Sequence, residues 1–331
     1  MLQKRVFANA VAGSAYKPAA AMQAMAKLSM ATCPLLTPTI FISHAAPSLL
    51  MEEHELGGPL RNAHRTSSPA NWYRQLLKQL GLVGNRRPQA IVIMSAHFES
   101  SDVVRIQSQD RYPTLYYDFA GFPERLYHFK YPAPGSTSVA SKIHDLLNSA
   151  NIPSKLDTKR NLDHGVFVPM SLMVPEADIP IIEVSMLDTF DPDTHLRIGK
   201  ALSSLRSENI LLIGSGEASH PPFNAAPHTK DHIKQYMNAW TAGLANPVSE
   251  SESKQLRREN LVRNWERLPN ARFSHPSPDH FIPLAFCVGA SSDSDVTYMI
   301  GDDWMSPWFS MRSFAFGDLD EKNPKNVKIT S

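Results

Sequence analysis

Three features are scarce or missing in this sequence, and each removes a class of protein. The chain has two cysteines, Cys33 and Cys287, which form no CxxC pair and are too few for a disulfide scaffold. A reducing compartment is therefore the simplest expectation. No uninterrupted apolar stretch approaches the ~18–20 residues that cross a bilayer, so no membrane partner is expected. The 33 basic and 32 acidic residues leave a net charge of +1, which argues against nucleic acid as a partner.

Acidic residues are also missing from the N-terminal segment. No Asp or Glu precedes Glu52, whereas Lys4, Arg5, Lys17 and Lys27 lie in a stretch rich in Ala, Met and Ser. Organellar transit peptides are likewise basic and poor in acidic residues. The segment has few arginines and no clear amphipathic face. We therefore favour a disordered extension and a cytoplasmic protein, with a mitochondrial targeting segment as the alternative.

Short apolar runs alternate with helical patterns along the rest of the chain. Runs of this length and composition are typical of strands buried on both faces of a sheet. They are Pro38–Ser43, Ala90–Ser95, Ile179–Met186, Asn209–Gly214 and Asp295–Ile300. The helical patterns cover Asn71–Leu82, Ser136–Asn151, Pro192–Ser207, Thr229–Leu244 and Ser249–Leu268. This alternation predicts an α/β fold with a mostly parallel central sheet and helices on both faces.

The domain organisation follows from the same pattern. We expect an N-terminal extension over residues 1–37, one catalytic domain over 38–320 and a C-terminal tail over 321–331. The segment Arg111–Gly135 interrupts the alternation and is dense in Tyr, Phe, Pro and Gly. Because loops of this length in compact domains are usually functional or disordered, and aromatic residues oppose disorder, we expect an ordered loop that forms part of a site.

Histidines follow the ends of three predicted strands. His44 comes directly after Pro38–Ser43, His97 lies two residues beyond Ala90–Ser95, and His220 follows Asn209–Gly214 by six residues. Ligands of α/β sheets bind at the carboxyl ends of strands, so these imidazoles are expected in one crevice. One such histidine alone is more often structural than catalytic, but imidazole is the commonest ligand for Fe and Zn. The joint pattern predicts a mononuclear metal site with open coordination positions.

Two further histidines, His164 and His280, lie in candidate site loops, and His280 precedes an apolar stretch expected to be a buried helix. His275 is either a neighbour that supports the site or a structural residue. The other histidines in polar or helical surroundings are expected at the surface. They are His54, His64, His144, His195 and His232.

Other catalytic signatures are absent. The glycine-rich segment 214–216 lacks the GxGxxG spacing of nucleotide-binding turns. Neither a GxSxG elbow nor an HExxH zinc motif occurs. Cys287 lies in an apolar run and is expected to be a buried small hydrophobic residue.

The order of short motifs along the chain resembles the 4,5-DOPA extradiol dioxygenase family, which belongs to the class III, LigB-like ring-cleavage enzymes. The motifs are His44-Ala45-Ala46-Pro47, Ser95-Ala96-His97-Phe98-Glu99, Gly121-Phe122-Pro123, Leu162-Asp163-His164-Gly165, Gly214-Ser215-Gly216-Glu217-Ala218-Ser219-His220 and His275-Pro276-Ser277-Pro278-Asp279-His280-Phe281. The resemblance runs from about Pro38 to about Phe316. It implies a globular, phosphorylase/hydrolase-like α/β fold of the LigB type.

The resemblance also implies a chemistry and roles for the five histidines. It points to one Fe(II) or Zn(II) ion per chain, with His44, His97 and His280 as metal ligands. His220 matches an active-site histidine that serves as acid or base and is sometimes counted as a further ligand. His164 matches a second active-site histidine that assists the oxygen chemistry. The implied reaction opens the ring of a small catechol, DOPA-like or related, with O2, in a monomer or a small homo-oligomer.

Ala45 and Ala46 depart from the family pattern, which usually has Gly and Ser there. The change alters backbone freedom beside a ligand and removes a hydroxyl group. Two alternatives stay open at this point. One is a zinc-dependent hydrolase on the same site, in which the metal activates water. The other is a binding protein without enzymatic activity that resembles the Memo family.

Overall fold

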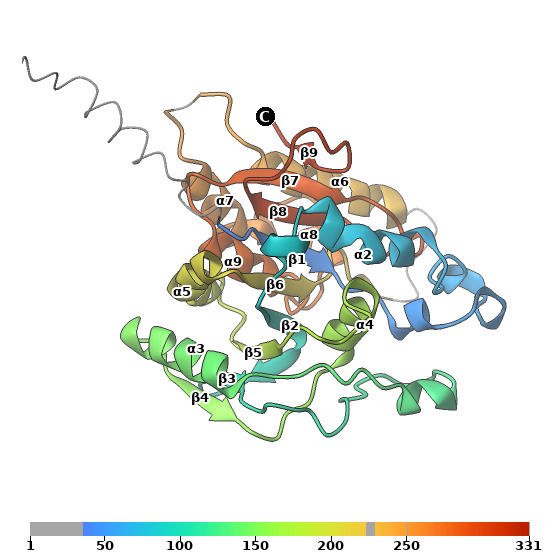
Figure 1. Cartoon of the computed structure of the whole chain (residues 1–331). Coiled ribbons are helices and arrows are strands. Elements are labelled where there is room, and N and C mark those ends of the chain that lie inside the picture. Colours follow the sequence, from blue (N-terminus) through green and yellow to red (C-terminus); the bar gives the residue numbers. More distant parts are fainter. Residues whose placement is uncertain (1–35, 223–228, 250, 331) are drawn as a thin grey trace, which may run out of the picture. The chain divides into compact units, whose positions relative to one another are not determined.

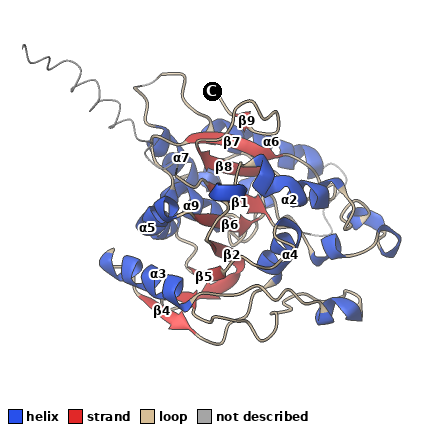
Figure 2. Ribbon diagram, in the orientation of Figure 1, coloured by secondary structure: helices blue, strands red, loops and turns tan. Residues whose placement is uncertain are grey.

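The computed structural model describes residues 36–222, 229–249 and 251–330, and these residues form one nine-stranded sheet with helices packed on it (Figure 2). The strands are β1 Thr39–Ser43, β2 Ala90–Ser100, β3 Val104–Gln107, β4 Ser154–Asp157, β5 Ile181–Leu187, β6 Ile210–Gly216, β7 Val296–Gly301, β8 Ser313–Gly317 and β9 Val327–Lys328. Their order across the sheet is β4-β3-β5-β2-β6-β1-β8-β7-β9. Of the predicted N-terminal extension 1–37, residues 1–35, which include Cys33, lie outside the described residues, whereas Thr37 is buried and donates its N–H to the carbonyl of Arg206.

The sheet is parallel in its centre and antiparallel toward one edge. The neighbours β5, β2, β6 and β1 run parallel to one another. From β1 outward, β8, β7 and β9 join in antiparallel pairs, and β3 lies antiparallel to β5 at the other side. The predicted α/β class with a parallel core is thereby confirmed, although the whole sheet is mixed. Strand β9 lies in the segment 321–331, which the sequence analysis assigns to a tail.

Helices cover both faces of the sheet, as predicted. They are α2 Ser68–Gln79, α3 Thr137–Ser149, α4 His164–Met173, α5 Pro192–Leu202, α6 Thr229–Leu244, α7 Lys254–Arg263, α8 Ala271–Ser274 and α9 Ile282–Ala290. In Figure 1, α3, α5 and α9 lie on the left of the sheet, and α2 and α4 lie on its right. Of the described helices, none combines the length and the apolar character needed to cross a membrane.

The alternation of side chains along β1 shows why helices must pack on both faces of the sheet. Phe41 packs into the core beneath α5 and α9, whereas Ile40 and Ile42 pack into the core beneath α2 and α4. All three side chains are fully buried. Successive residues of a strand point to opposite faces, so a continuous apolar run is stable only between two layers of helices. Cys287 of α9 is buried in the first of these cores, as expected.

The register of the parallel strands aligns the segments that carry the histidines. Ser43 of β1 is paired with Gly216 of β6, and Ser95 of β2 is paired with Ser215. The next residues of these chains therefore emerge at one edge of the sheet. Strand β2 does not end at Ser95 as predicted; it continues to Ser100, with a register shift against β5 between Met94 and Glu99. His97 lies within this irregularity, where a bulge can redirect a side chain.

Candidate metal centre

All five histidines singled out from the sequence line one cavity of about 250 Å³ at the carboxyl edge of the parallel strands. They are His44, His97, His164, His220 and His280. They come from segments that are far apart in the sequence: the ends of β1 and β6, the irregular part of β2, the first residue of α4 and the turn before α9. The expectation that these imidazoles share a crevice is therefore met by the geometry.

The distances between the rings divide the histidines into two groups. The Nε2 atoms of His44 and His97 are 3.1 Å apart, and one ligand atom from each of His44, His97 and His164 lies within 4.8 Å of the others. The ring centre of His280 is 5.3 Å from that of His44 and 5.0 Å from that of His97. His220 stacks on His280, with ring centres 4.0 Å apart. The tightest described cluster thus contains two of the predicted ligands, His44 and His97. Its third member is His164, whereas the predicted third ligand is His280.

The tautomer of His44 is fixed by a hydroxyl group of the neighbouring strand. Its Nδ1 lies 3.0 Å from Ser215 Oγ, and that hydroxyl donates its proton to the carbonyl of Gly165. Since the hydroxyl proton is already used, Ser215 must accept a hydrogen bond from the Nδ1–H of His44. The lone pair of His44 is then on Nε2, which faces the cavity.

Asp118 orients two more of the imidazoles, and it is a residue that sequence reasoning missed. Its Oδ1 lies 2.7 Å from Nδ1 of His164, and its Oδ2 lies 3.3 Å from Nδ1 of His97. The first contact is a hydrogen bond that fixes His164 with Nδ1 protonated, whereas Oδ2 makes no hydrogen bond among the described residues and favours a protonated Nδ1 on His97 through its charge. The Nε2 atom of each ring is then left with a lone pair. Asp118 belongs to the loop Arg111–Gly135. The aromatic residues of this loop indicated that it forms part of the site, but no sequence pattern marked Asp118 as a partner of the histidines.

Burial lowers the pKa of four imidazoles of the site, those of His44, His97, His220 and His280, and so favours their uncharged form at neutral pH. Desolvation lowers the pKa of His97 to about 4, with the neighbouring His164 as the next cause. Desolvation, followed by other histidines of the cluster, also holds the pKa values of His44 and His280 well below their usual range. The pKa of His220 is lowered by the same burial, against the opposing effect of Asp279. Neutral imidazole is the form that binds metal ions.

A buried carboxyl group, Glu217, completes the cavity wall and was also missed. Its side chain is only 3% exposed, and one of its oxygens lies 3.9 Å from Nε2 of His44. That oxygen, Oε1, accepts the backbone N–H of Ala45, whereas Oε2 has no hydrogen-bond partner among the described residues. Burial raises the pKa of Glu217 well above its usual range. An adjacent cation would reverse this effect, because it stabilises the ionised form.

Ala45 adopts the left-handed backbone conformation, with φ of +65°. This conformation is strained for a residue with a side chain, and it is the position at which the family usually has glycine. The hydrogen bond from Ala45 N–H to Glu217 helps to hold the turn that directs His44 into the cavity. The sequence difference noted above therefore falls on a residue whose backbone conformation favours glycine.

Two glycines allow the elements of the site to approach closely. A Cβ atom on Gly216 would lie 2.1 Å from the carbonyl oxygen of His280, and one on Gly165 would lie 2.7 Å from Ser95 Oγ. The first contact brings the turn before α9 against β6, and the second brings the start of α4 against β2. The glycine-rich segment 214–216 thus serves packing around the histidines.

Of the histidines that were expected at the surface, one is buried instead. His195 was predicted at the surface but is fully buried in α5, where its Nδ1–H donates to Asp191 O and its Nε2 accepts the N–H of Leu187. His275 is fully buried as well and lies between Tyr236 Oη and the carbonyl of Glu217. Both rings have protein partners for both nitrogens, and neither lines the histidine cavity.

The donor set fits a metal ion. With His44 and His97 both protonated on Nδ1, two Nε2 lone pairs face each other at 3.1 Å, which is unfavourable unless a cation lies between or beside them. Several buried neutral nitrogens together with one carboxyl group suit Zn(II) or Fe(II). The arrangement offers ligands on one side and leaves cavity space on the other, as a catalytic site requires.

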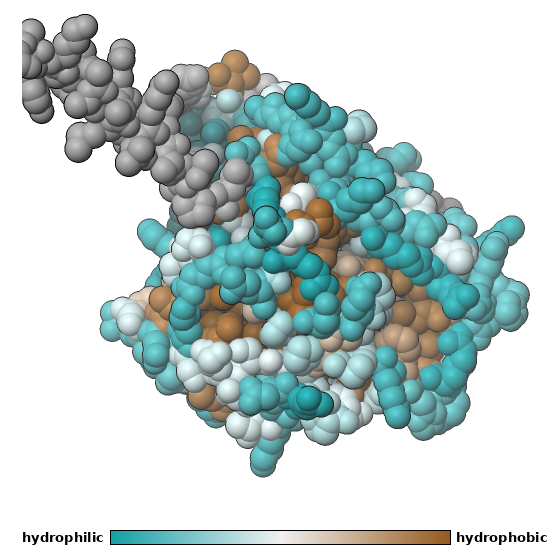
Figure 3. All heavy atoms as spheres, in the orientation of Figure 1, coloured by the Kyte–Doolittle hydropathy of each residue, from teal (hydrophilic) through white to brown (hydrophobic). Residues whose placement is uncertain are grey.

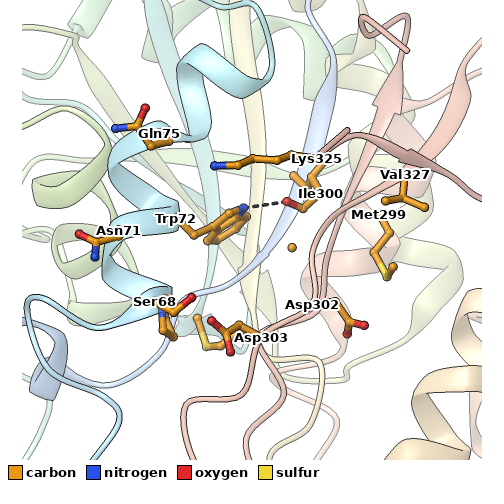
Figure 4. Close-up of a pocket in the computed structure, with 13 residues that line it drawn as sticks. Ser68, Asn71, Trp72, Gln75, Met299, Ile300, Asp302, Asp303, Lys325 and Val327 are labelled. Atoms are coloured by element: carbon orange, nitrogen blue, oxygen red, sulfur yellow. Dashed lines mark hydrogen bonds between the residues drawn. The ribbon is translucent and has the colours of Figure 1, made fainter. Parts of the chain in front are cut away.

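A larger cavity of about 440 Å³ lies elsewhere, between α2 and the end of β7 (Figure 4). Its wall is formed around Trp72, whose indole N–H donates to the carbonyl of Ile300. Asp302 at its rim is paired with Arg312. The cavity contains no histidine among its lining residues, so it is not the metal site.

Comparison with known proteins places residues 38–310 in the family described as the catalytic LigB subunit of aromatic ring-opening dioxygenase. A 4,5-DOPA dioxygenase extradiol from Beta vulgaris is 34% identical over 279 residues, which cover 84% of this chain and 96% of that protein. A 4,5-DOPA dioxygenase extradiol-like protein from Schizosaccharomyces pombe is 33% identical and covers 78% of this chain and 86% of its own length.

The fold also has a counterpart among solved structures. A crystal structure of an uncharacterized protein from Escherichia coli K12 superposes with a TM-score of 0.62 and 24% identity. The match covers 85% of this chain and 100% of that chain. At this identity the likeness supports the fold alone.

Proposed function

We propose that this chain, which belongs to the LigB family of aromatic ring-opening dioxygenases, opens the ring of a catechol with O2 in the histidine cavity. The observation that carries the proposal is the convergence of the Nε2 atoms of His44 and His97, 3.1 Å apart, beside three further imidazoles. Both oxygen atoms of O2 enter the product, which is a semialdehyde with a carboxyl group. The names of the relatives make DOPA the first catechol to test.

We assign one divalent ion, Fe(II) or Zn(II), to His44, His97 and His280, with His220 close by. When bound, the ion would supply Lewis acidity and coordination positions for the catechol oxygens and O2. Ser215 and Asp118 hold His44 and His97 in the tautomers that such ligation needs. His164 is then left to accept a hydrogen bond through its Nε2 beside the reacting oxygen, with its ring held by Asp118.

His220 is the proposed acid and base. Its lowered pKa keeps the imidazole neutral at pH 7, so it can accept a proton from a catechol hydroxyl and return it later in the reaction. Its ring is held between His280 and Phe309, which lie 4.0 and 5.5 Å away between ring centres. This packing fixes the ring toward the cavity without placing it in the tightest nitrogen cluster.

The proposal is tested by loading the metal-free protein anaerobically with Fe(II) or Zn(II) and then measuring O2 uptake with DOPA, caffeate, protocatechuate and 4-methylcatechol. We expect O2 consumption in a one-to-one ratio with catechol and a yellow semialdehyde product. Ester or amide hydrolysis by the Zn(II) form without O2 uptake would favour the hydrolase. Inactivity of both metal forms across the panel would favour a Memo-like binding protein.

His220→Ala separates the roles of the histidines. We expect its turnover to fall by ~100-fold or more, because a positioned acid or base contributes about that factor, while its metal content stays near one ion per chain. His280→Ala should lose metal as well as turnover. A His280→Ala protein that retains a full ion while His164→Ala does not would move the third ligand to His164.

A further inference from the structure

The cavity is apolar beyond the imidazoles. Its outer wall is formed by Leu60, Phe119, Phe122, Met305 and Phe309. Phe119 and Phe122 come from the aromatic loop and contact each other edge to face, with ring centres 5.4 Å apart. In Figure 3, hydrophobic atoms are visible in a recess on the right of the view, where Figure 1 draws the segment after β1 and the loop before α3. A ring substituent that points away from the histidines would therefore meet hydrocarbon.

The part of this wall that the structure describes carries no lysine or arginine side chain, and the sequence of residues 223–228 contains neither. Arg160 lies behind His97, where one of its nitrogens donates to the His97 carbonyl and to Asp163. Arg125, within the aromatic loop, is paired with Glu55. Both guanidinium groups are engaged outside the cavity.

Among the described residues that line the cavity, one carries a carboxyl group. Glu217 is buried against His44, and its Oε2 has no hydrogen-bond partner among the described residues. The described lining therefore presents hydrocarbon and imidazole, and no cationic side chain, to a ring substituent. A substrate carboxylate would bring a negative charge without a cationic partner into this small, largely apolar space, where an unpaired charge is strongly unfavourable.

We propose that this enzyme selects catechols whose ring substituent is uncharged and apolar, such as an alkyl or aryl group, over catechols that carry a carboxylate. The inference rests on the proposed ring-opening function and narrows its substrate class. It predicts that DOPA itself is a poor substrate, because its side chain carries both a carboxylate and an ammonium group.

The test uses the full-length, metal-loaded protein and a matched pair of substrates. In 4-methylcatechol and protocatechuate the same ring position carries a methyl group or a carboxylate. We expect kcat/KM from initial O2 uptake to be at least about 100-fold higher for 4-methylcatechol, which corresponds to leaving a buried carboxylate unpaired. Equal or better turnover of protocatechuate would overturn the inference while leaving the ring-opening function intact. Failure of both substrates, with DOPA and caffeate also inert, would instead overturn the proposed function.

A charge introduced into the wall provides the second test. Leu60→Arg should lower the preference for 4-methylcatechol over protocatechuate by at least about 10-fold, because it supplies a partner for the carboxylate. Leu60→Met is the matched control and should keep the wild-type preference. Phe122→Arg repeats the test from the opposite segment and guards against misfolding of a single variant, which circular dichroism would reveal. An unchanged preference in both folded arginine variants would show that the substituent does not meet this wall.

Discussion

Two groups of histidines in this protein have similarly lowered pKa values and differ in where their nitrogens point. The side chain of His97 is 21% exposed, whereas His195 is fully buried. Burial lowers the pKa of His97 in the cavity to about 4, and it lowers the pKa of His195 in α5 to about 4 as well. The nitrogens of His195 are both satisfied by backbone groups. Those of His97 are divided between Asp118 on one side and the Nε2 of His44 on the other.

The comparison shows that neither burial nor a shifted pKa identifies the site. A structural histidine stabilises the fold by filling both hydrogen-bonding positions within the protein. A ligand histidine uses one nitrogen for orientation and presents the other to a shared point. The distinguishing observation is therefore the convergence of free lone pairs from several strands.

The largest expected effects come from exchanging the two kinds of histidine for alanine. His97→Ala should reduce bound metal from about one ion per chain to near zero and abolish activity, with little change in the metal-free melting temperature. His195→Ala should do the reverse, because it leaves the Leu187 N–H unsatisfied and opens a cavity, at a cost of about 2–4 kcal/mol in the free energy of unfolding.

Elemental analysis and urea unfolding measure these two outcomes on the same preparations. Full metal content in His97→Ala would contradict the assignment of that residue. A metal-depleted but normally stable His195→Ala would contradict the division into two groups.

Asp118→Asn tests the residue that orients two site histidines at once. The amide can no longer accept from both Nδ1–H groups, so the rings lose their fixed tautomers. We expect metal affinity to fall by about 10- to 100-fold, as for other partners of ligating histidines. Competition with a chelator measures this affinity, and Asp102→Asn, at an exposed carboxylate far from the cavity lining, is the control. Equal affinities for the two variants would remove Asp118 from the proposed site.

The pH dependence of stability tests the contribution of the structural histidines. His195 and His275 have folded-state pKa values of about 4 and about 3, below the ordinary value of 6.5, mainly because they are buried. Their contribution to stability is complete above pH ~6.5 and is lost as the pH falls toward 4, since the unfolded chain then binds more protons. Urea unfolding of the metal-free protein should show this decline. His195→Gln should make the decline shallower, and an identical slope would contradict the interpretation.

The smallest expected effect concerns backbone strain at the site. Ala45→Gly relieves the positive φ, so we expect unfolding to cost up to about 1 kcal/mol more, partly offset by the greater freedom of glycine in the unfolded chain. Ala177→Gly is a matched control at a positive φ of +50° outside the cavity. A substantial loss of stability in Ala45→Gly, with a gain in Ala177→Gly, would show that Ala45 is not strained.

The sequence predicted five of the nine described strands and missed β3, β4, β9 and also β8 Ser313–Gly317, although β8 is largely apolar and buried along its whole length. Each predicted strand lies on one of β1, β2, β5, β6 and β7. Strands β3 and β4 were missed because they are only four residues long and carry charged residues; β3 pairs with both β4 and β5, and β4 pairs with β3. His195 was misplaced because its helix looked polar at that position, whereas α5 packs that side against the end of β5.

By itself, the sequence determined the α/β alternation and the placement of histidines after apolar strands, because strand periodicity and strand ends are local properties of the chain. The tertiary structure decided which nitrogen of each ring faces the cavity and which carboxyl groups, Asp118 and Glu217, accompany them. These features depend on contacts between residues that are distant in the sequence. Ser215 of β6 contacts His44 after β1, and Asp118 of the aromatic loop contacts His97 of β2. The turn at Ala45 also contributes, because it directs His44 into the cavity. Tautomer and charge at the site are set by such partners, which no local pattern of residues encodes.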